Sequence, residues 1–330
     1  AAAQDATPAA SPAASPTAYE PFTSMNREEW KAKLFAWWAE QDPPYAEPAN
    51  TGGQVIMGDA GSFVATTNAL LGADSPTNPV NALVFETLVA SSPIDGDYVP
   101  GLADYWTIDS DGKTYTFYIN ANATWSDGTP LTAADCVMSY DAQSNPDTGS
   151  SYTGTFVAFV ASYEAVDDKT FKVVATDIFP QIVFLGNAYA PIMPAHIWGD
   201  VEPANWASDG GSTGADLTRV IGSGPFTYTS YDGSTTRAEF AKNEGYWDDV
   251  PVIDQFVFQS SAEETAAIEQ LRAGDIDFYE NVPAPDVADL DALDNVNVAL
   301  YSTYSFSWWG YNLDPEKTTL FQQPEVRKAL

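Results

Sequence analysis

Residues 98–135 read YVPGLADYWTIDSDGKTYTFYINANATWSDGTPLTAAD, and this stretch decides the class of fold. Apolar and polar side chains alternate over residues 106–108 and 115–119, which predicts two strands with distinct faces. The connector at residues 109–112, Asp-Ser-Asp-Gly, supplies the turn residues that a β-hairpin requires. We therefore expect a β-hairpin in this part of the chain.

A helix is predicted to follow the hairpin. Residues 126–130, Ser-Asp-Gly-Thr-Pro, turn the chain, after which Thr132 and Asp135 have the spacing of a helix N-cap and the third helical residue. Cys136 lies in the apolar-patterned segment that follows and is the only cysteine, so the chain can form no internal disulfide. We expect its thiol to be buried in the core.

Strands and helices are predicted to alternate along the rest of the chain. Ser261 and Glu264 have the spacing of a second capping box, and Gly274 is expected to end the helix that this box begins. Such alternation favours an α/β or α+β fold with more than one domain. The expected strands are residues 55–57, 256–258, 276–278 and 296–301, and the expected helices are residues 80–88, 262–273 and 285–293.

The N-terminal region differs in composition from the rest. Apart from Gln4 and Asp5, residues 1–18 are Ala, Pro, Ser and Thr with almost nothing to bury, so we expect a disordered tether; a cloning or proteolytic remnant is the alternative. Asn26 and Glu29 predict a capping box at the start of a helix. We expect the apolar face of this helix to pack on the main body, with a partner or membrane contact as the alternative. That face is formed by Trp30, Leu34, Trp37 and Trp38.

The charge balance excludes several classes of function. The 330 residues include 13 Lys and Arg against 46 Asp and Glu, for a formal net charge of −33. Such a chain would be repelled by phosphate backbones and anionic membrane surfaces, so we expect no nucleic acid partner. No apolar run approaches the roughly 18 residues that span a bilayer, and no basic and then apolar signal segment opens the chain. We expect a mature form of a secreted protein.

Several motifs in a fixed order carry a resemblance to a known family. They are residues 98–106, the turn at 111–112, residues 125–135, GSGPF at 222–226, NEGYW at 243–247, LRAGDID at 271–277, YN at 311–312 and PEVRKAL at 324–330. Over residues 52–330 the chain resembles extracellular solute-binding protein family 5, the peptide, nickel and oligosaccharide receptors of ABC importers. Two positions depart from the family pattern: Asn120 stands where a basic residue is usual, and Trp125 replaces a Phe.

The resemblance implies a two-lobed fold like that of periplasmic binding proteins, with the second lobe incomplete because the chain is expected to be shortened at its C-terminus. It implies a tether over residues 1–25, a helix and linker over 26–50, a first lobe over 51–270 with a family-specific subdomain at about 81–185, and the start of a second lobe over 271–330. It further implies hinge closure around a peptide or oligosaccharide, ABC permease partners, a monomer outside the cell or in the periplasm held as a lipoprotein, no cofactor, no metal and no enzymatic activity.

The same resemblance points to two ligand-binding segments. Residues 302–312, STYSFSWWGYN, resemble the strand between the lobes, whose aromatic side chains face the cleft, and the turn at residues 59–63 is the second candidate. Trp308 and Trp309 point to opposite sides of a strand, so one can line the cleft while the other packs in a lobe. A packing role for either Trp, and a strand-edge role for Asn312, remain alternatives. The candidates are Tyr304, Trp308, Trp309, Asn312, Ser62 and Phe63.

The sequence also contains features of hydrolases, metal-binding proteins and sensors. Residues 210–214, GGSTG, fit the pattern of a hydrolase nucleophile elbow, which needs a strand before it and a helix after it. Ser212 is instead predicted to lie in a Gly/Ser/Asp loop, and His196 precedes it in the chain. His196 is the only histidine and is expected to be structural, which disfavours nickel. Glycoside hydrolysis by paired carboxylates and a ligand-sensing module that signals through a membrane partner also remain alternatives.

Overall fold

The computed structural model describes residues 19–41, 51–61, 64–72, 77–150, 153–187, 190–231, 237–300, 311–314 and 316–329. These residues fall into two compact units, the first ending at Val282 and the second beginning at Pro283. Across the described part of the chain, every helix is too short or too polar to cross a membrane.

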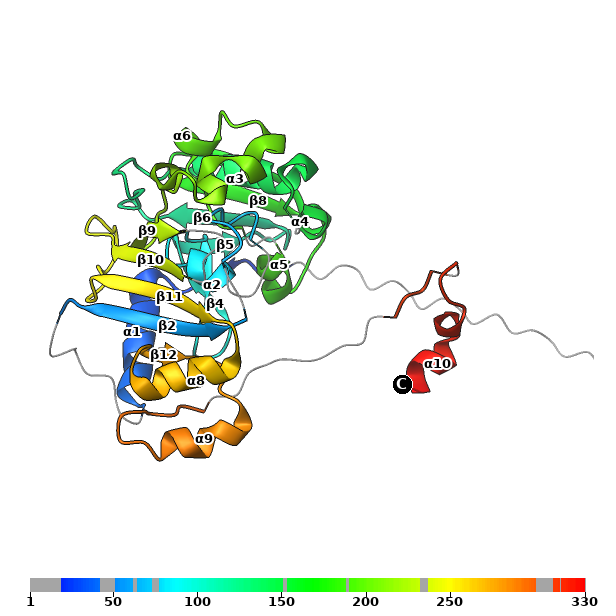
Figure 1. The fold of residues 1–330 in the computed structure, drawn as a ribbon. Helices are drawn as coiled ribbons and strands as arrows, with labels where there is room; N and C mark the ends of the chain where they lie inside the picture. The colour runs from blue at the N-terminus through cyan, green and yellow to red at the C-terminus, as the bar shows by residue number, and fades with distance from the viewer. Residues whose placement is uncertain are drawn as a thin grey trace, which may run out of the picture. The chain divides into compact units, whose positions relative to one another are not determined.

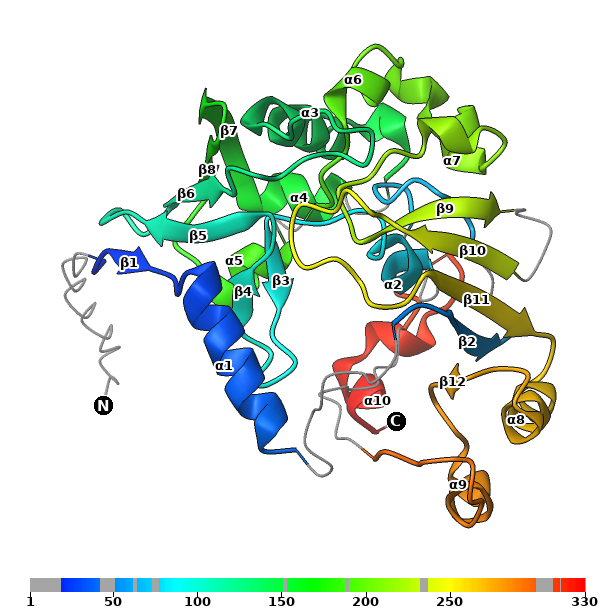
Figure 2. The ribbon, with the colours of Figure 1, turned by 90° about the vertical axis from the view of Figure 1, so that its left-hand side faces the viewer.

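The predicted hairpin lies in an antiparallel sheet of the first unit (Figures 1 and 2). Trp106 faces Phe117 across the two central strands, and both side chains are buried. Gly112 closes the turn with a φ of 69°, which suits a residue without a Cβ. In spatial order the strands are β1 (Phe22–Thr23), β5 (Ala103–Ile108), β6 (Thr114–Ile119), β8 (Thr170–Ala175) and β7 (Val160–Asp167).

Helix α3 (Ala133–Ser144) follows the hairpin and begins at the predicted capping box. The backbone N–H of Thr132 donates to Asp135 over 2.7 Å, and the other Asp135 oxygen accepts from the backbone of Ala195 over 2.8 Å. Cys136 is fully buried in this helix, as predicted, and burial raises the pKa of its thiol. The cap of α3 therefore also fixes the short helix α6 (Ala195–Trp198).

The second five-stranded sheet is mixed (Figures 1 and 2). Three neighbouring strands, β12, β2 and β11, are parallel, and the other two are antiparallel to their neighbours. Helix α8 (Glu264–Ala273) packs against the three parallel strands. The spatial order is β12 (Phe278–Tyr279), β2 (Gln54–Ala60), β11 (Gln255–Ser261), β10 (Arg237–Lys242) and β9 (Phe226–Tyr231).

The motif at residues 222–226 brings two distant segments of backbone into contact. The N–H of Gly224 donates to the carbonyl of Val84 over 2.9 Å, and the N–H of Phe226 donates to that of Leu83 over 3.0 Å. A Cβ on Gly222 would overlap the Val84 carbonyl oxygen, so a side chain would force the segments apart. The two glycines thus permit the close approach on which β9 starts.

Several predicted elements differ from the observed ones. The expected helix over residues 80–88 is instead α2 (Thr77–Asn81) followed by turns, because this backbone pairs with residues 222–226. Ser261 makes no capping box: α8 has Glu263 at its N-cap without a side-chain cap bond, and Ser261 still belongs to β11. The strand expected at residues 276–278 is β12, and residues 296–300 form no strand.

The remaining elements of the first unit lie outside its two five-stranded sheets. They are α1 (Arg27–Ala39), the pair β3 (Val89–Ser91) and β4 (Tyr98–Pro100), α4 (Thr153–Phe159), α5 (Gln181–Asn187), α7 (Gly210–Thr213) and the 3-10 helices Pro146–Thr148, Pro203–Ser208 and Leu217–Arg219.

The second unit contains α9 (Ala284–Asp291), which agrees with the predicted helix at 285–293, and α10 (Pro324–Ala329). A 3-10 turn, Leu320–Gln322, precedes α10. Tyr311 lies beside Phe321 with ring centroids 5.0 Å apart, and its hydroxyl donates to the carbonyl of Arg327 over 3.1 Å. These contacts join the segment at Tyr311 to the end of the chain.

Candidate functional site

The carboxyl ends of three parallel strands meet at one edge of the mixed sheet (Figure 2). At this edge Ala60 of β2 is paired with Ser261 of β11, and Tyr279 of β12 is paired with Gly58. In open α/β sheets, ligands bind in the crevice outside the carboxyl ends of the strands. We refer to residues 59–61, 260–264 and 279 as the carboxyl edge and take it as the candidate ligand-binding site.

Hydrogen bonds hold the strands of the carboxyl edge in register. The N–H of Gly61 donates to the carbonyl of Ser261 over 2.8 Å, which continues the ladder beyond the last paired residues. The Ser261 hydroxyl donates to Gln270 of α8 over 2.8 Å. On the opposite side of β2, Asp277 exchanges two bonds with the backbone of Ile56, at 2.8 and 2.9 Å. The backbone at the edge is therefore fixed from both sides.

Asp59, Glu264 and Tyr279 all belong to the carboxyl edge. The Tyr279 side chain is 9% exposed. Burial and, after it, the charges of Glu264 and Asp59 raise the pKa of the Tyr279 hydroxyl.

The loop that leads away from the carboxyl edge is pinned by buried polar groups. Thr67 and Asn68 are fully buried. The Thr67 hydroxyl donates to the carbonyl of Gly211 over 2.6 Å, and the Asn68 amide donates to the Ser212 hydroxyl over 3.1 Å. Tyr231 donates to the carbonyl of Val64 over 2.7 Å. Since buried polar groups are costly to leave unpaired, these bonds fix the backbone at residues 64–68.

These bonds also settle the role of Ser212. Its side chain is 1% exposed and lies in α7, a four-residue helix rather than the predicted loop. A 3-10 helix precedes α7, whereas a nucleophile elbow requires a strand there. His196 contacts Asp127 instead, with Nε2 2.8 Å from the carboxylate. The arrangement is not that of a serine hydrolase.

His196 lies at the surface next to the turn at residues 126–130. Its ring lies edge-on to Trp125 with centroids 6.4 Å apart. Burial opposes ionisation of Asp127, but hydrogen bonds from Thr129 and His196 prevail and lower the pKa of this carboxyl. Among the described residues, no group of three or more His, Cys, Asp or Glu side chains is placed to hold a metal ion.

Five of the six predicted contact residues lie outside the described residues: Ser62, Phe63, Tyr304, Trp308 and Trp309. The sixth, Asn312, is exposed in the second unit, where its side-chain oxygen accepts from the backbone of Asp314 over 2.9 Å. Asp59 and Gly61, which belong to the second predicted segment, lie at the carboxyl edge. Sequence reasoning did not single out Tyr279 or Glu264, because β12 is only two residues long and Glu264 was assigned to a cap.

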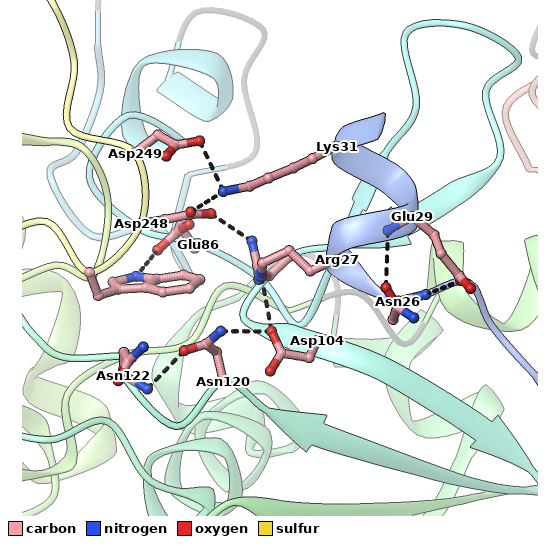
Figure 3. Close-up of polar contacts among 12 residues, drawn as sticks. Asn26, Arg27, Glu29, Lys31, Glu86, Asp104, Asn120, Asn122, Asp248 and Asp249 are labelled. Atoms are coloured by element: carbon pink, nitrogen blue, oxygen red, sulfur yellow. Dashed lines mark hydrogen bonds and ion pairs between the residues drawn. The ribbon is translucent and has the colours of Figure 1, made fainter. Parts of the chain in front are cut away.

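A second group of polar residues joins α1 to the rest of the first unit (Figure 3). The predicted capping box is present, with Asn26 and Glu29 exchanging bonds of 2.9 and 3.0 Å. Arg27 pairs with Asp104 at 3.0 Å and with Asp248 at 2.7 Å, and its guanidinium lies 4.7 Å from the centre of the Trp247 ring. We call Arg27, Lys31, Asp104, Asp248 and Asp249 the α1 ion-pair cluster.

The cluster corrects how α1 was expected to pack. Of the predicted apolar face only Trp30 is buried; Leu34, Trp37 and Trp38 are half-buried, and Phe35 is 48% exposed. Lys31 adds ion pairs to Asp248 at 2.5 Å and to Asp249 at 2.9 Å. Ion pairs therefore act together with the buried Trp30 to hold α1 against the first unit.

Asn120 also contributes to this region. It stands where the family usually carries a basic residue and donates to Asp104 over 2.7 Å. Asp104 nevertheless receives a cation, because Arg27 reaches the same carboxylate oxygen from α1. The Arg27 guanidinium therefore provides Asp104 with the positive charge that a basic residue at position 120 would carry.

Glu86 lies next to the α1 ion-pair cluster (Figure 3). One carboxylate oxygen accepts from the Tyr246 hydroxyl over 2.9 Å, and the other accepts from the Trp247 indole over 3.0 Å. Desolvation raises the pKa of Glu86 to about 7, although these bonds, Ser223 and the charge of Arg27 act in the opposite direction. The local sequence did not predict the buried hydrogen bonds of Glu86, because its partners Tyr246 and Trp247 lie in the distant motif at residues 243–247.

The chain is similar to known proteins in both sequence and fold. The sequence model of bacterial extracellular solute-binding proteins, family 5, middle region, matches residues 97–330. A probable ABC transporter-binding protein of Deinococcus radiodurans is 27% identical over 329 residues, covering 87% of this chain and 53% of that protein. The oligopeptide-binding protein AppA of Bacillus subtilis is 27% identical, with 84% and 49% covered. The chain spans about half the length of the curated relatives it matches.

Solved structures confirm the predicted fold class. That of B. subtilis AppA in complex with a nonapeptide superimposes with a TM-score of 0.67 at 24% identity, over 74% of this chain and 47% of that one. The substrate-binding protein CtaP of Listeria monocytogenes gives a TM-score of 0.57 at 28% identity, over 69% and 44%. The fold is thus the mixed α/β fold of periplasmic binding proteins, seen over part of its length, and the family is one of binding proteins rather than enzymes. The chain belongs to the bacterial extracellular solute-binding proteins of family 5.

Proposed function

We propose that the protein is the peptide receptor of an ABC importer. The observation that carries this proposal is the family match over residues 97–330. Relatives support peptides as the ligand: AppA is named an oligopeptide-binding protein, DppE of B. subtilis a dipeptide-binding protein, and the AppA structure holds a nonapeptide. An oligosaccharide ligand is the second candidate, favoured by the 10 Trp and 17 Tyr residues.

The mechanism that we propose is closure of two lobes around the ligand. Residues 51–270 would belong to the first lobe and residues 271–330 would begin the second. A ligand that contacts both lobes favours the closed state, and the permease then recognises that state. Ser62 and Phe63 come next after Gly61 in the sequence, and we propose them as ligand contacts. The remaining candidates are Tyr304, Trp308, Trp309 and Asn312.

We propose that the protein acts outside the cell or in the periplasm. Residues 1–18 would be the flexible tether of a lipoprotein that acts as a monomer, because their composition suits a spacer and not a packed element. ABC permease subunits would be the partners. A sensing module that signals through another membrane protein would use the same tether and the same ligand site.

The test is a ligand panel with the full-length protein. Peptides of two to nine residues and oligosaccharides are added separately, and the melting temperature and Trp emission are recorded. A ligand at 100 times its dissociation constant stabilises the bound fold by about 2.7 kcal/mol, so a true ligand raises the melting temperature measurably. Turnover of a ligand without any such shift would contradict the proposal. Loss of peptide uptake on gene deletion separates the importer from the sensor.

A further inference from the structure

Residues 19–41 lie along the outside of the first unit and contain β1 and α1. We call residues 19–41 the strap, and we call the rest of the first unit, from residue 51 onward, the body. Figure 2 shows the strap at the edge of the antiparallel sheet and then beside β4, which α1 contacts. The strap meets the body at three places: the hairpin turn, strand β5 and the α1 ion-pair cluster.

The first two attachments bury few side chains. The ring of the half-buried Tyr19 lies against the hairpin turn, where a Cβ on Gly112 would come within 2.9 Å of it. Strand β1 pairs with β5 over two residues, and both of their side chains are exposed. Ser24 exchanges two hydrogen bonds with the backbone of Trp106, at 2.9 and 3.0 Å. Because so little apolar area is buried here, backbone bonds rather than packing hold this part of the strap.

The third attachment depends on charge. All three basic residues of the strap, Arg27, Lys31 and Lys33, pair with carboxylates of the body. Arg27 is the most enclosed, with its side chain 12% exposed, whereas the side chain of Lys33 is 39% exposed and pairs with Asp95 at 2.7 Å. Exposed ion pairs of the latter kind contribute little to stability. Helix α1 is therefore fixed chiefly around Arg27.

The strap and the body differ in how much apolar surface they bury. Of the thirteen residues of α1 only Trp30 is buried, and Phe35 is 48% exposed. In β6, by contrast, three of the six residues are buried: Tyr115, Phe117 and Ile119. Segments with few buried apolar side chains open at lower free energy than the core of a domain. The strap should therefore open more readily than the sheet beneath it.

We propose that the strap is a detachable element, which undocks from the body as one unit while the body stays folded. Strand β1 and helix α1 leave together because only residues 24–26 separate them, and Ser24 is itself bonded to the body. With the strap docked, the residues before Tyr19 leave the molecule at the hairpin turn. Undocking adds the strap to that leading segment, up to about 80 Å of extended chain. Docking would thereby set how far the receptor reaches from an N-terminal anchor.

Native-state hydrogen exchange tests whether the strap opens without the body. The full-length protein is exchanged in low concentrations of urea, and the protection of amides in α1 and β6 is followed by mass spectrometry. We expect protection in α1 to be at least about tenfold lower than in β6 and to depend less on urea, because undocking exposes less surface than unfolding. Equal protection and equal urea dependence would overturn the proposal, since the strap would then open only with the body.

A disulfide lock tests whether β1 and α1 move together. Thr23 and Thr107 are paired across β1 and β5, so their Cβ atoms lie within about 5.5 Å, near the range that a disulfide requires. The native Cys136 is fully buried, which leaves Thr23→Cys and Thr107→Cys as the reactive pair. Loss of free thiol confirms that the lock has formed.

The locked protein should exchange the amides of α1 at least about tenfold more slowly than the same protein after reduction, which should match the parent. The single variant Thr23→Cys is the matched control and should exchange like the parent before and after reduction. Equal rates in the locked and reduced proteins would show that α1 opens independently of β1, and release as one unit would be wrong. This inference goes beyond the proposed function, because neither measurement requires a ligand.

Discussion

Replacing Glu86 by Gln should change how the stability of the first unit depends on pH. In the folded protein the pKa of this carboxyl is raised from 4.5 to about 7, chiefly by desolvation. In the unfolded chain the carboxyl loses its proton at lower pH than in the folded protein. Between those two pKa values the folded state therefore holds one more proton, and stability falls as pH rises.

The size of this effect follows from the same shift. Each pH unit between the two pKa values removes about 1.4 kcal/mol, so the total loss by pH 8 is at most about 3 kcal/mol. The amide of Glu86→Gln resembles the protonated carboxyl, because its oxygen can accept from Trp247 and its NH2 group can donate to the Tyr246 hydroxyl oxygen. The variant should match the parent near pH 5 and exceed its stability by pH 8.

The assay is urea unfolding followed by Trp emission at several values between pH 5 and pH 8. Glu20→Gln, at an exposed glutamate, is the matched control and should keep the slope of the parent. Parallel curves for the parent and Glu86→Gln over this range would refute the reasoning, since the parent would then gain no proton at Glu86 on folding.

Three further predictions concern packing and charge. Arg27→Met should lower the free energy of unfolding by about 3 kcal/mol in urea titrations, because it removes a largely buried guanidinium, leaving Asp104 without an ion pair and Asp248 with Lys31 alone; an effect below about 1 kcal/mol would show that the ion pairs contribute little. Gly222→Ala should destabilise by more than about 3 kcal/mol or prevent folding, whereas Gly154→Ala, at an open helical position, should be neutral or stabilising, as measured by melting temperature. Added NaCl should raise the melting temperature, because a net charge of −33 repels itself, and a flat response would contradict this.

Local patterns predicted those elements whose ends are set by neighbouring residues. The hairpin at residues 109–112, the caps at Asn26 and Thr132 and the end of α8 at Gly274 all depend on bonds within a few positions. A turn or a helix cap depends on the residue types at a few neighbouring positions, so the local sequence predicts it. Such features could be read without the tertiary structure.

Elements whose ends are set by hydrogen bonds to distant segments could not be predicted from the local sequence. The run at residues 80–88 has a helical apolar pattern, but the carbonyls of Leu83 and Val84 accept from Phe226 and Gly224, far along the chain. Ser261 has the spacing of a cap, yet its carbonyl continues the ladder with β2, so the strand extends and α8 begins later. In both cases tertiary hydrogen bonds outweighed a local preference, since each satisfies backbone groups that burial would leave unpaired.

The number of charged residues is known from the sequence, whereas their pairing is known only from the structure. Composition showed that carboxylates greatly outnumber cations, but not which carboxylates are neutralised, because Arg27 finds its partners 77 and 221 positions away. With 13 cations for 46 acidic residues, most carboxylates have no cation to pair with. Which carboxylates are paired depends on contacts between segments far apart in the chain, so a count of charges in the sequence gives the net charge but not the position of the ion pairs.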